Sequence, residues 1–198
     1  SDATAHLARG GRFPLTAQGK INTYSVFAET MRTVVKPDGA AGIITPTGLA
    51  TDKNTAPFFA DTLSKHRLHT FYDFENEEKI FRDVHHGERF AITVMSGAQR
   101  PAARTKFAFL TRYISDLHEK RFRLAAEEIL KLNPNTGTLP MLRTRKDADI
   151  TLGIYSRQPV LMRDDDPDGN PWGLSFSQGL FNMSSDSGLF HSSDDLAG

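Results

Sequence analysis

The chain has 198 residues and a formal net charge of zero, with 24 Lys and Arg against 24 Asp and Glu side chains. A hydrophobic fraction of 38%, including fourteen Phe, can support one substantial core and argues against wholesale disorder. The absence of cysteine excludes disulfides and cysteine-ligated metal, and it fits a reducing, cytoplasmic location. We find no apolar run of membrane-spanning length and no signal peptide, so we expect no membrane partner.

The charges are distributed unevenly along the sequence. Basic side chains outnumber acidic ones between Arg100 and Lys146, and aspartates dominate beyond Arg163. A free-standing DNA-binding domain is usually distinctly basic, so the zero net charge counts against one. The basic segment is suited to contact a phosphate backbone, although an ordinary solvated face would have the same composition.

Hydrophobic periodicity up to about residue 113 predicts alternating helices and strands, which indicates an open α/β sheet. In the first helix, Val26, Phe27, Met31 and Val34 have the spacing of a core-facing stripe, and the Asn-Thr pair at its start can supply a cap. The predicted elements are, in chain order, a helix over 23–35, a strand over 40–45, a helix over 55–66, and strands over 68–74, 90–95 and 105–113.

Two features indicate how the strands are arranged. The strand over 40–45 is short and rich in small and apolar residues, which is typical of a buried strand in a parallel sheet. The connector between strands 68–74 and 90–95 is too short for a crossover helix, so this pair is predicted to be antiparallel. That connector is polar, and its apolar points are Ile80, Phe81 and Val84.

The pattern changes beyond residue 113. A short helix over 125–132 precedes a turn-rich connector, and a further helix over 147–157 carries Ile150, Ile154 and Tyr155 on one side. We therefore predict one domain over 12–113 and an appendage over 114–198. Beyond Asp164, Gly, Asp, Ser and Pro dominate, and we expect the large apolar side chains there to dock onto a neighbour. These side chains are Trp172, Phe176, Leu180, Phe181 and Phe190.

Several stretches of the sequence occur in a distinctive order. In chain order they are Gly19-Lys-Ile-Asn-Thr-Tyr-Ser-Val-Phe-Ala-Glu, Pro37-Asp-Gly-Ala-Ala-Gly-Ile-Ile-Thr-Pro-Thr-Gly, Phe71-Tyr-Asp-Phe-Glu-Asn, Lys79-Ile-Phe-Arg-Asp-Val-His-His-Gly-Glu-Arg-Phe, Asn133-Pro-Asn-Thr-Gly-Thr-Leu-Pro and Asn170-Pro-Trp-Gly. This order resembles the second half of a gamma-class N6-adenine DNA methyltransferase domain and the connector that follows it. The likeness is greatest to the long methylases of restriction–modification and phage-exclusion systems, and it covers the chain from about Arg12 onward.

The resemblance implies a partial Rossmann-like methyltransferase sheet with an antiparallel final strand, followed by a mixed helical and irregular connector toward target recognition. The first half of such an enzyme carries the glycine-rich methyl-donor loop and the catalytic Asn-Pro-Pro-aromatic tetrapeptide, and neither motif occurs in this sequence. We therefore expect a fragment that has no catalytic residues and no activity in isolation. The parent would use S-adenosylmethionine and double-stranded DNA, whereas the fragment would bind no cofactor.

The resemblance also assigns candidate site residues. Phe81 matches the aromatic that provides a stacking face for the flipped adenine, although an ordinary core position remains an alternative. Thr45, Pro46 and Thr47 follow a strand, and ligands of open α/β sheets bind beyond the carboxyl ends of strands. These three residues are therefore expected to line the cleft, although a simple strand-terminating turn would explain them equally well.

Other polar residues are candidates for DNA contacts or for metal binding. The side chains expected to contact the DNA backbone are Lys79, Arg82, Arg89, Arg104 and Lys106. His85 and His86 invite a metal interpretation, but neighbouring histidines point to opposite sides of a strand and no carboxylate stands at ligand spacing. The Asp164–Asp168 cluster lacks the ligand pattern of a calcium loop, so we expect no metal site.

Two other functions remain open from the sequence. One is a non-catalytic module that binds DNA or another subunit, and the other is an unrelated α/β domain that binds a small ligand. In the methyltransferase interpretation the natural partner is the missing N-terminal half of the methylase. Apolar surface left uncovered by that half would promote self-association.

Overall fold

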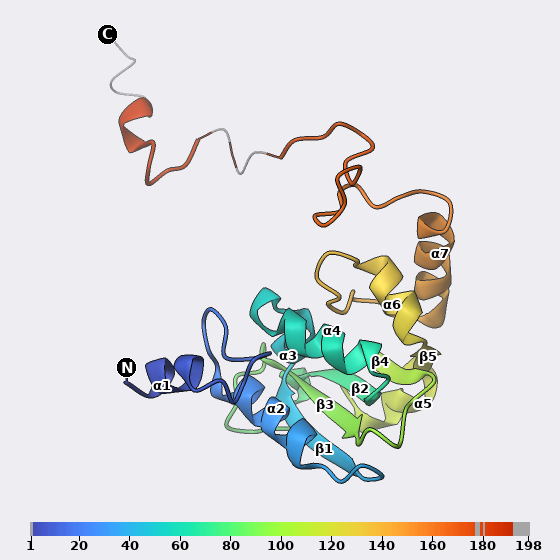
Figure 1. Cartoon of the computed structure of the whole chain (residues 1–198). Helices are drawn as coiled ribbons and strands as arrows, with labels where there is room; N and C mark the ends of the chain where they lie inside the picture. The colour runs from blue at the N-terminus through green and yellow to red at the C-terminus, as the bar shows by residue number, and fades with distance from the viewer. Residues whose placement is uncertain (1, 177–178, 180, 192–198) are drawn as a thin grey trace. The chain divides into compact units, whose positions relative to one another are not determined.

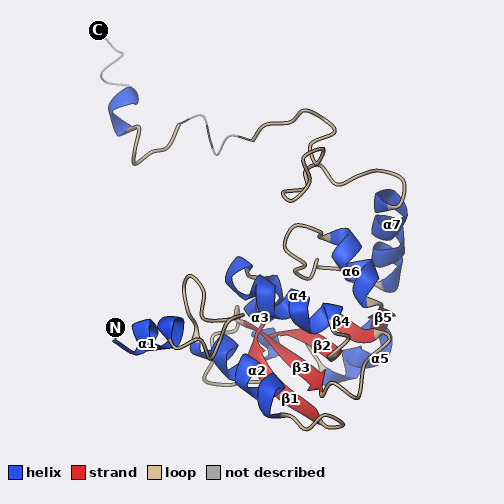
Figure 2. Cartoon of the chain, viewed as in Figure 1, coloured by secondary structure: helices blue, strands red, loops and turns tan. Residues whose placement is uncertain are grey.

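The computed structural model describes residues 2–176, 179 and 181–191. Contacts divide the chain into two units, the first ending at Val160 and the second beginning at Leu161. The first unit is a mixed α/β domain (Figures 1 and 2). The sequence placed its boundary near residue 113, whereas the strand and helices that follow still pack against the first sheet. Among the described residues, no helix is both long and apolar enough to cross a membrane.

The elements of the first unit follow the predicted order closely. The helices are α1 (Asp2–Arg9), α2 (Thr23–Val34), α3 (Gly48–Thr51), α4 (Ala56–Ser64), α5 (Leu117–Lys120), α6 (Ala126–Leu132) and α7 (Arg145–Tyr155). The strands are β1 (Ala40–Pro46), β2 (Leu68–Glu75), β3 (Arg89–Ser96), β4 (Thr105–Thr111) and β5 (Phe122–Leu124). Short 3-10 turns lie at Lys53–Thr55, Asn76–Glu78 and Ile114–Asp116.

The described residues form a five-stranded mixed sheet with the order β1-β3-β2-β4-β5. β3 is antiparallel to both β1 and β2, which confirms the predicted antiparallel pair. β2 and β4 are parallel, and β5 is antiparallel to β4. As a result β1 and β2 run in the same direction with β3 reversed between them, and β1 forms one edge of the sheet.

The prediction that β1 is a buried strand of a parallel sheet is wrong. β1 is antiparallel to its neighbour and its side chains alternate in burial, so that Ile43 is buried while Ile44 is 58% exposed. The apolar composition of β1 led to the wrong prediction because it shows only that the strand packs against part of the core, and not that both of its faces are covered. One face of β1 meets helix α2, and no helix among the described residues covers the opposite face in a comparable way.

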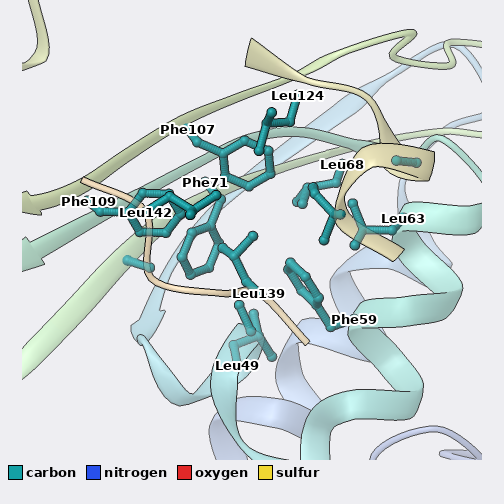
Figure 3. Packing of buried hydrophobic residues seen from close by; sticks show 14 of the residues in the cluster. Leu49, Phe59, Leu63, Leu68, Phe71, Phe107, Phe109, Leu124, Leu139 and Leu142 are labelled. Atoms are coloured by element: carbon teal, nitrogen blue, oxygen red, sulfur yellow. The ribbon is translucent and has the colours of Figure 1, made fainter. Parts of the chain in front are cut away.

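The core lies between the sheet and the helices on one of its faces. Large aromatic and aliphatic side chains from β2 and β4 meet those of α3 and α4 there. Figure 3 shows Leu139 and Leu142, from the segment after α6, packed among Phe59, Phe71 and Phe109. The backbone N–H of Leu139 also donates to the carbonyl of Ala50 at 2.9 Å. The segment after α6 is thus part of the first unit because its leucines complete the same core.

Helix α2 does not present the predicted stripe to the core. Phe27 and Val34 are 56% and 64% exposed, and the buried face instead carries Ala28, Glu29 and Arg32. The Glu29 carboxylate accepts hydrogen bonds from the backbone N–H and the hydroxyl of Thr16, at 3.0 and 2.6 Å. The predicted side-chain cap is also absent at the start of this helix. Polar side chains occupy the buried face because they have partners in the preceding loop and in α4.

Arg32 connects α2 to α4. Its Nη1 lies 2.7 Å from both the Asp61 carboxylate and the Thr62 hydroxyl. Burial raises the pKa of Asp61, but a hydrogen bond from Lys65 and the charge of Arg32 outweigh this, so the net pKa is lowered. Because the folded-state pKa is depressed, this stabilisation is present above the unfolded pKa of about 3.9 and is lost as the pH falls through the folded value.

We expect Asp61→Asn to destabilise the chain at pH 7 and to have progressively less effect as the pH falls below about 4. The measurement is the urea unfolding midpoint of both proteins across the pH range. The exposed turn residue Asp38, changed to Asn, serves as the control. A gap between wild type and Asp61→Asn that stays constant down to pH 2 would show that the ion pair does not stabilise the fold.

The second unit consists mainly of turns. Asn170 closes one of them, since its side chain donates to the carbonyl of Leu174 and accepts from the N–H of the same residue. Phe181 and Phe190 contact each other edge to face at 6.0 Å, while Trp172 and Phe176 are mostly exposed. Leu180, which the sequence grouped with these side chains, lies outside the described residues.

Candidate functional site

A cavity of about 420 Å³ lies where β1 ends and β3 begins. Antiparallel pairing places Pro46 opposite Phe90, so the end of β1 and the start of β3 border it together. The segment that joins β2 to β3 closes a third side. The lining residues are Ile44, Thr45, Pro46, Phe81, Val84, Glu88, Arg89 and Phe90. Four candidates from the sequence, Thr45, Pro46, Phe81 and Arg89, thus meet in one place although they are far apart along the chain.

Phe81 lies at the surface of this cavity with its ring partly open to solvent. It is 38% exposed and contacts Phe90 edge to face, with ring centroids 4.8 Å apart. Phe90 in turn stacks on the buried Phe74 at 5.2 Å. Phe81 is therefore braced on one side by the core and leaves part of its ring free to contact a planar ligand.

Asn76 fixes the segment that carries Phe81. Its fully buried side chain donates to the carbonyls of Phe81 and Val84, at 2.9 and 3.0 Å, and accepts from the N–H of Phe81 at 2.9 Å. Its own N–H donates to the carbonyl of Glu88 at 3.0 Å, which closes the base of the segment. Asn76 was not among the site residues predicted from the sequence. An amide at the end of a strand is a recognisable turn signal, because Asn can bond to backbone on both its donor and its acceptor side.

A second network lies beneath the cavity around the fully buried Asp73 of β2. Its carboxylate accepts the hydroxyl of Thr47 at 2.7 Å and the N–H of Leu110 at 2.9 Å, and it forms an ion pair with Arg89. Leu110 has a positive φ of 51°, which is uncommon for a bulky residue. Asp73 therefore connects the residue after β1, the start of β3 and an irregular step in strand β4 at Leu110.

This network decides the positions of two residues predicted from the sequence. Thr47 is buried and bonded to Asp73, and it is not among the residues that line the cavity. Arg89 does line the cavity, but its Nη2 is held by Asp73 and lies 3.3 Å from the Met141 sulfur. Thr45 contributes a buried hydroxyl that has no hydrogen-bond partner within the described part of the chain.

The other predicted DNA-contacting cations fall into two groups. Lys79 and Arg82 are exposed on the same connecting segment as Phe81. Arg104 and Lys106 lie at the start of β4, beyond β3 and β2 across the sheet. Arg104 forms an ion pair with Glu128 at 2.8 Å. The structure therefore groups two of the five cations beside Phe81 and places the β4 pair at a separate location.

The histidine pair lies on the same connecting segment. The rings of His85 and His86 are 4.4 Å apart, and His86 Nδ1 contacts the Glu77 carboxylate at 3.0 Å. The hydrogen bond from His86 lowers the pKa of Glu77. Within the described ranges, no three His, Asp or Glu side chains gather closely enough to hold a metal ion.

A second cavity, of about 400 Å³, opens at the carboxyl end of β4. Its charged lining residues are Glu75, Arg112, Lys120 and Arg143. Arg112 is paired with Glu75 at 2.9 Å, and Lys120 donates to the carbonyl of Leu110 at 2.5 Å. Two of the three cations of this cavity, Arg112 and Lys120, thus already have partners within the fold.

The comparisons with known proteins give no family for the chain. No family model matches the sequence, and no curated protein matches it either.

Proposed function

We propose that this chain forms the carboxyl-terminal part of the catalytic sheet of a site-specific, S-adenosylmethionine-dependent DNA adenine-N6 methyltransferase of a restriction–modification or phage-defence system. In this proposal the cavity at the end of β1 receives an adenine that has left the DNA stack. Phe81 contacts the flipped base, Thr45 and Pro46 line the cavity, and Lys79 and Arg82 meet the DNA backbone beside it.

The observation that carries the proposal is the meeting of Thr45, Pro46 and a partly exposed Phe81 in one cavity. A target base must leave the duplex before its amino nitrogen can react, and it then needs an apolar, partly aromatic pocket. Stacking of a base on an aromatic ring contributes about 1–3 kcal/mol and tolerates any base. A Phe buried in the core could not serve in this way, whereas Phe81 retains an accessible ring.

The strand arrangement gives independent support. β3 is antiparallel between β1 and β2, which run in the same direction, and the sequence resemblance implies an antiparallel strand of this kind at the end of the sheet, whereas here β4 and β5 follow it. The outer edge of β1 has no strand partner among the described residues. An unpaired edge next to the cavity is where a further strand, carrying the amine-binding tetrapeptide, can add to the sheet.

The residues of this chain do not fit the methyl donor. The sequence has no glycine-rich donor loop, and the cavity is lined mainly by Phe, Ile, Val and Pro residues, with Thr45 and two charged residues, Glu88 and Arg89. We therefore assign to this chain only the holding and orienting of the base. Purified alone, it should give no methyl transfer from labelled S-adenosylmethionine to DNA, and robust turnover would contradict the proposal.

The decisive experiment changes Phe81 in the full-length gene product that includes this chain. Phe81→Ala should lower kcat/KM for DNA methylation about 10- to 100-fold, which corresponds to about 1–3 kcal/mol of lost stacking. Phe81→Trp should retain most of the activity because it keeps an aromatic face. Phe27→Ala, which removes an exposed phenyl ring from α2 away from the cavity, is the control. Equal activity of Phe81→Ala and Phe27→Ala would rule out the stacking role.

A non-catalytic module that binds DNA or another subunit is the second candidate. It is favoured by the exposed apolar side chains Ile44, Val84 and Phe81 around the cavity, which would suit a protein partner. A full-length parent without a donor loop and without methylation activity would select this function instead.

A further inference from the structure

Three basic side chains surround a separate cavity on the outer side of β4 and β5. The cavity has a volume of about 200 Å³ and is lined by Lys106, Arg121, Phe122 and Arg123. We refer to Lys106, Arg121 and Arg123 as the β4–β5 cation cluster. All three side chains are exposed, while their strand neighbours Phe107 and Phe122 are buried on the opposite face. Among the described residues, no acidic side chain lines the cavity.

The strand register brings two of these charges directly opposite each other. Lys106 of β4 is the cross-strand partner of Arg123 of β5. Like charges in this position repel and destabilise a strand pair, unlike an aromatic or oppositely charged pair. Arg121 adds a third positive charge two residues before Arg123. The folded chain therefore holds three cations together at a cost in electrostatic repulsion.

Two arginines close to the β4–β5 cation cluster, Arg104 and Arg145, have their charges neutralised by carboxylates. Arg104 is paired with Glu128, and Arg145 is paired with both Glu128 and Asp149. In the part of the chain that the structure describes, no carboxylate forms an ion pair with Lys106, Arg121 or Arg123. The three cations around the cavity thus stay uncompensated within the described residues, whereas Arg104 and Arg145 beside them are neutralised.

The backbone at this site is firmly held. The carbonyl of Arg123 accepts hydrogen bonds from Arg104 Nη2 at 3.2 Å and from Arg145 Nη1 at 2.6 Å. Both of these arginines are themselves fixed by Glu128. The repulsion between Lys106 and Arg123 is therefore not relieved by movement of the strand, and an added anion would relieve it.

We propose that the β4–β5 cation cluster is a phosphate-binding site that holds the backbone of the DNA whose base enters the Phe81 cavity. Two guanidinium groups and one ammonium suit a phosphodiester, since arginine forks bind phosphate oxygens in pairs and lysine adds a point charge. This deepens and rests on the proposed function, because the ligand is taken to be the same duplex. The proposal assigns DNA binding to Lys106 and not to Arg104, because Glu128 already neutralises the charge of Arg104.

The site and the Phe81 cavity open on the same face of the sheet. Following the register across the strands, Lys106 shares a face with Thr70, Val94 and Gly42. The alternate positions on that same face of β1 and β3 are Ile44, Pro46 and Phe90, which line the cavity. β3 and β4 are separated by β2, and Phe90 lies four residues along β3 from Val94, which is in register with Lys106, so the two sites are roughly 15–20 Å apart.

The test compares the wild-type chain with Lys106→Gln/Arg123→Gln in binding to a random-sequence duplex of about 25 base pairs over a range of salt concentrations. Each lost phosphate contact should reduce the slope of log affinity against log salt by about 0.9, so the double variant should lose nearly 2 units of slope. Its affinity at low salt should fall at least 10-fold. Arg157→Gln removes one exposed charge from the end of α7 and should leave the slope unchanged.

Stability provides a readout that a merely structural role would not give. The side chains of Lys106 and Arg123 are exposed and repel each other. Lys106→Gln should therefore raise the urea unfolding midpoint slightly at low salt and leave it unchanged at high salt, where the repulsion is screened. A lowered midpoint would contradict the uncompensated repulsion. Inorganic phosphate, titrated by calorimetry, separates a small-anion site from a DNA site. Phosphate binding that the double variant abolishes, with no change in DNA binding, would overturn the assignment to DNA.

The outcome for this site can be separated from the outcome for the proposed function. If the salt slope depends on Lys106 and Arg123 while Phe81→Ala leaves methylation unchanged, the methyltransferase role fails and the phosphate site stands. If the wild-type chain binds no DNA at low salt, or if the double variant binds as tightly as the wild type, the phosphate site is disproved whatever the methylation result.

Discussion

Replacing Asp73 with alanine should lower the free energy of unfolding by about 3 kcal/mol. The fully buried carboxylate has three donors, the hydroxyl of Thr47, the N–H of Leu110 and the guanidinium of Arg89. Removing one partner of a buried ion pair typically costs about 3–5 kcal/mol, because the remaining charge loses its compensation. The lower end of that range applies, since the Arg89 side chain is 32% exposed and can turn partly toward water.

A double variant separates the charge effect from simple loss of packing. Asp73→Ala/Arg89→Met removes both charged partners, so it should be more stable than Asp73→Ala alone. Urea unfolding, followed by circular dichroism, gives the free energies, and Asp83→Ala on the exposed connecting segment is the control. An Asp73→Ala variant as stable as Asp83→Ala would show that the network does not hold β1, β3 and β4 together.

Replacing Asn76 with alanine should release the segment that carries Phe81. Three hydrogen bonds of 2.9–3.0 Å to the backbone of Phe81 and Val84 would be lost. At about 0.5–1.5 kcal/mol each, they contribute roughly 2–4 kcal/mol to closing the segment. The segment from Lys79 to Glu88 is exposed and can be hydrated once released, so the expected effect is local opening with the sheet intact.

Amide hydrogen exchange measures this directly. Exchange of the Phe81 N–H should accelerate about 30-fold or more in Asn76→Ala, while the strand amides of β2 and β4 should keep their protection. Asn76→Asp keeps the acceptor for Phe81 but places a buried carboxylate against the carbonyls of Phe81 and Val84, so its effect at pH 7 should be at least as large as that of Asn76→Ala. Asn54→Ala, at an exposed position, is the matched control. Unchanged exchange at Phe81 in Asn76→Ala would disprove the anchoring role.

The candidate site shows where sequence reasoning succeeds and where it stops. Phe81, Thr45 and Pro46 were selected from their places beside strands, and the structure brings them to one cavity. Thr47 was grouped with them, but it lies just beyond the end of β1, and its hydroxyl donates to the Asp73 carboxylate instead. Asp73 was not selected, because its partners lie 16 to 37 residues away along the chain. Asn76 was missed although its partners are only five to eight residues away, because its turn signal was not recognised.

The helix faces show a similar limit. The spacing of Val26, Phe27, Met31 and Val34 predicted the existence of α2 correctly but not the face that it buries. That face is chosen by Glu29 and Arg32, which find partners in the loop before the helix and in α4. A polar side chain can be buried when its partners are in place, and periodicity alone does not reveal those partners.

The sequence by itself determined the order of the helices and strands, the α/β class and the antiparallel pairing of β2 with β3. These follow from local periodicity and from a connector too short for a crossover, both of which act over a few residues. Only the tertiary structure decided that β1 is an edge strand, that Phe81 is partly open, and that Lys106 opposes Arg123 without a neutralising carboxylate. Strand order, burial and charge pairing depend on contacts between distant parts of the chain, which no local pattern encodes.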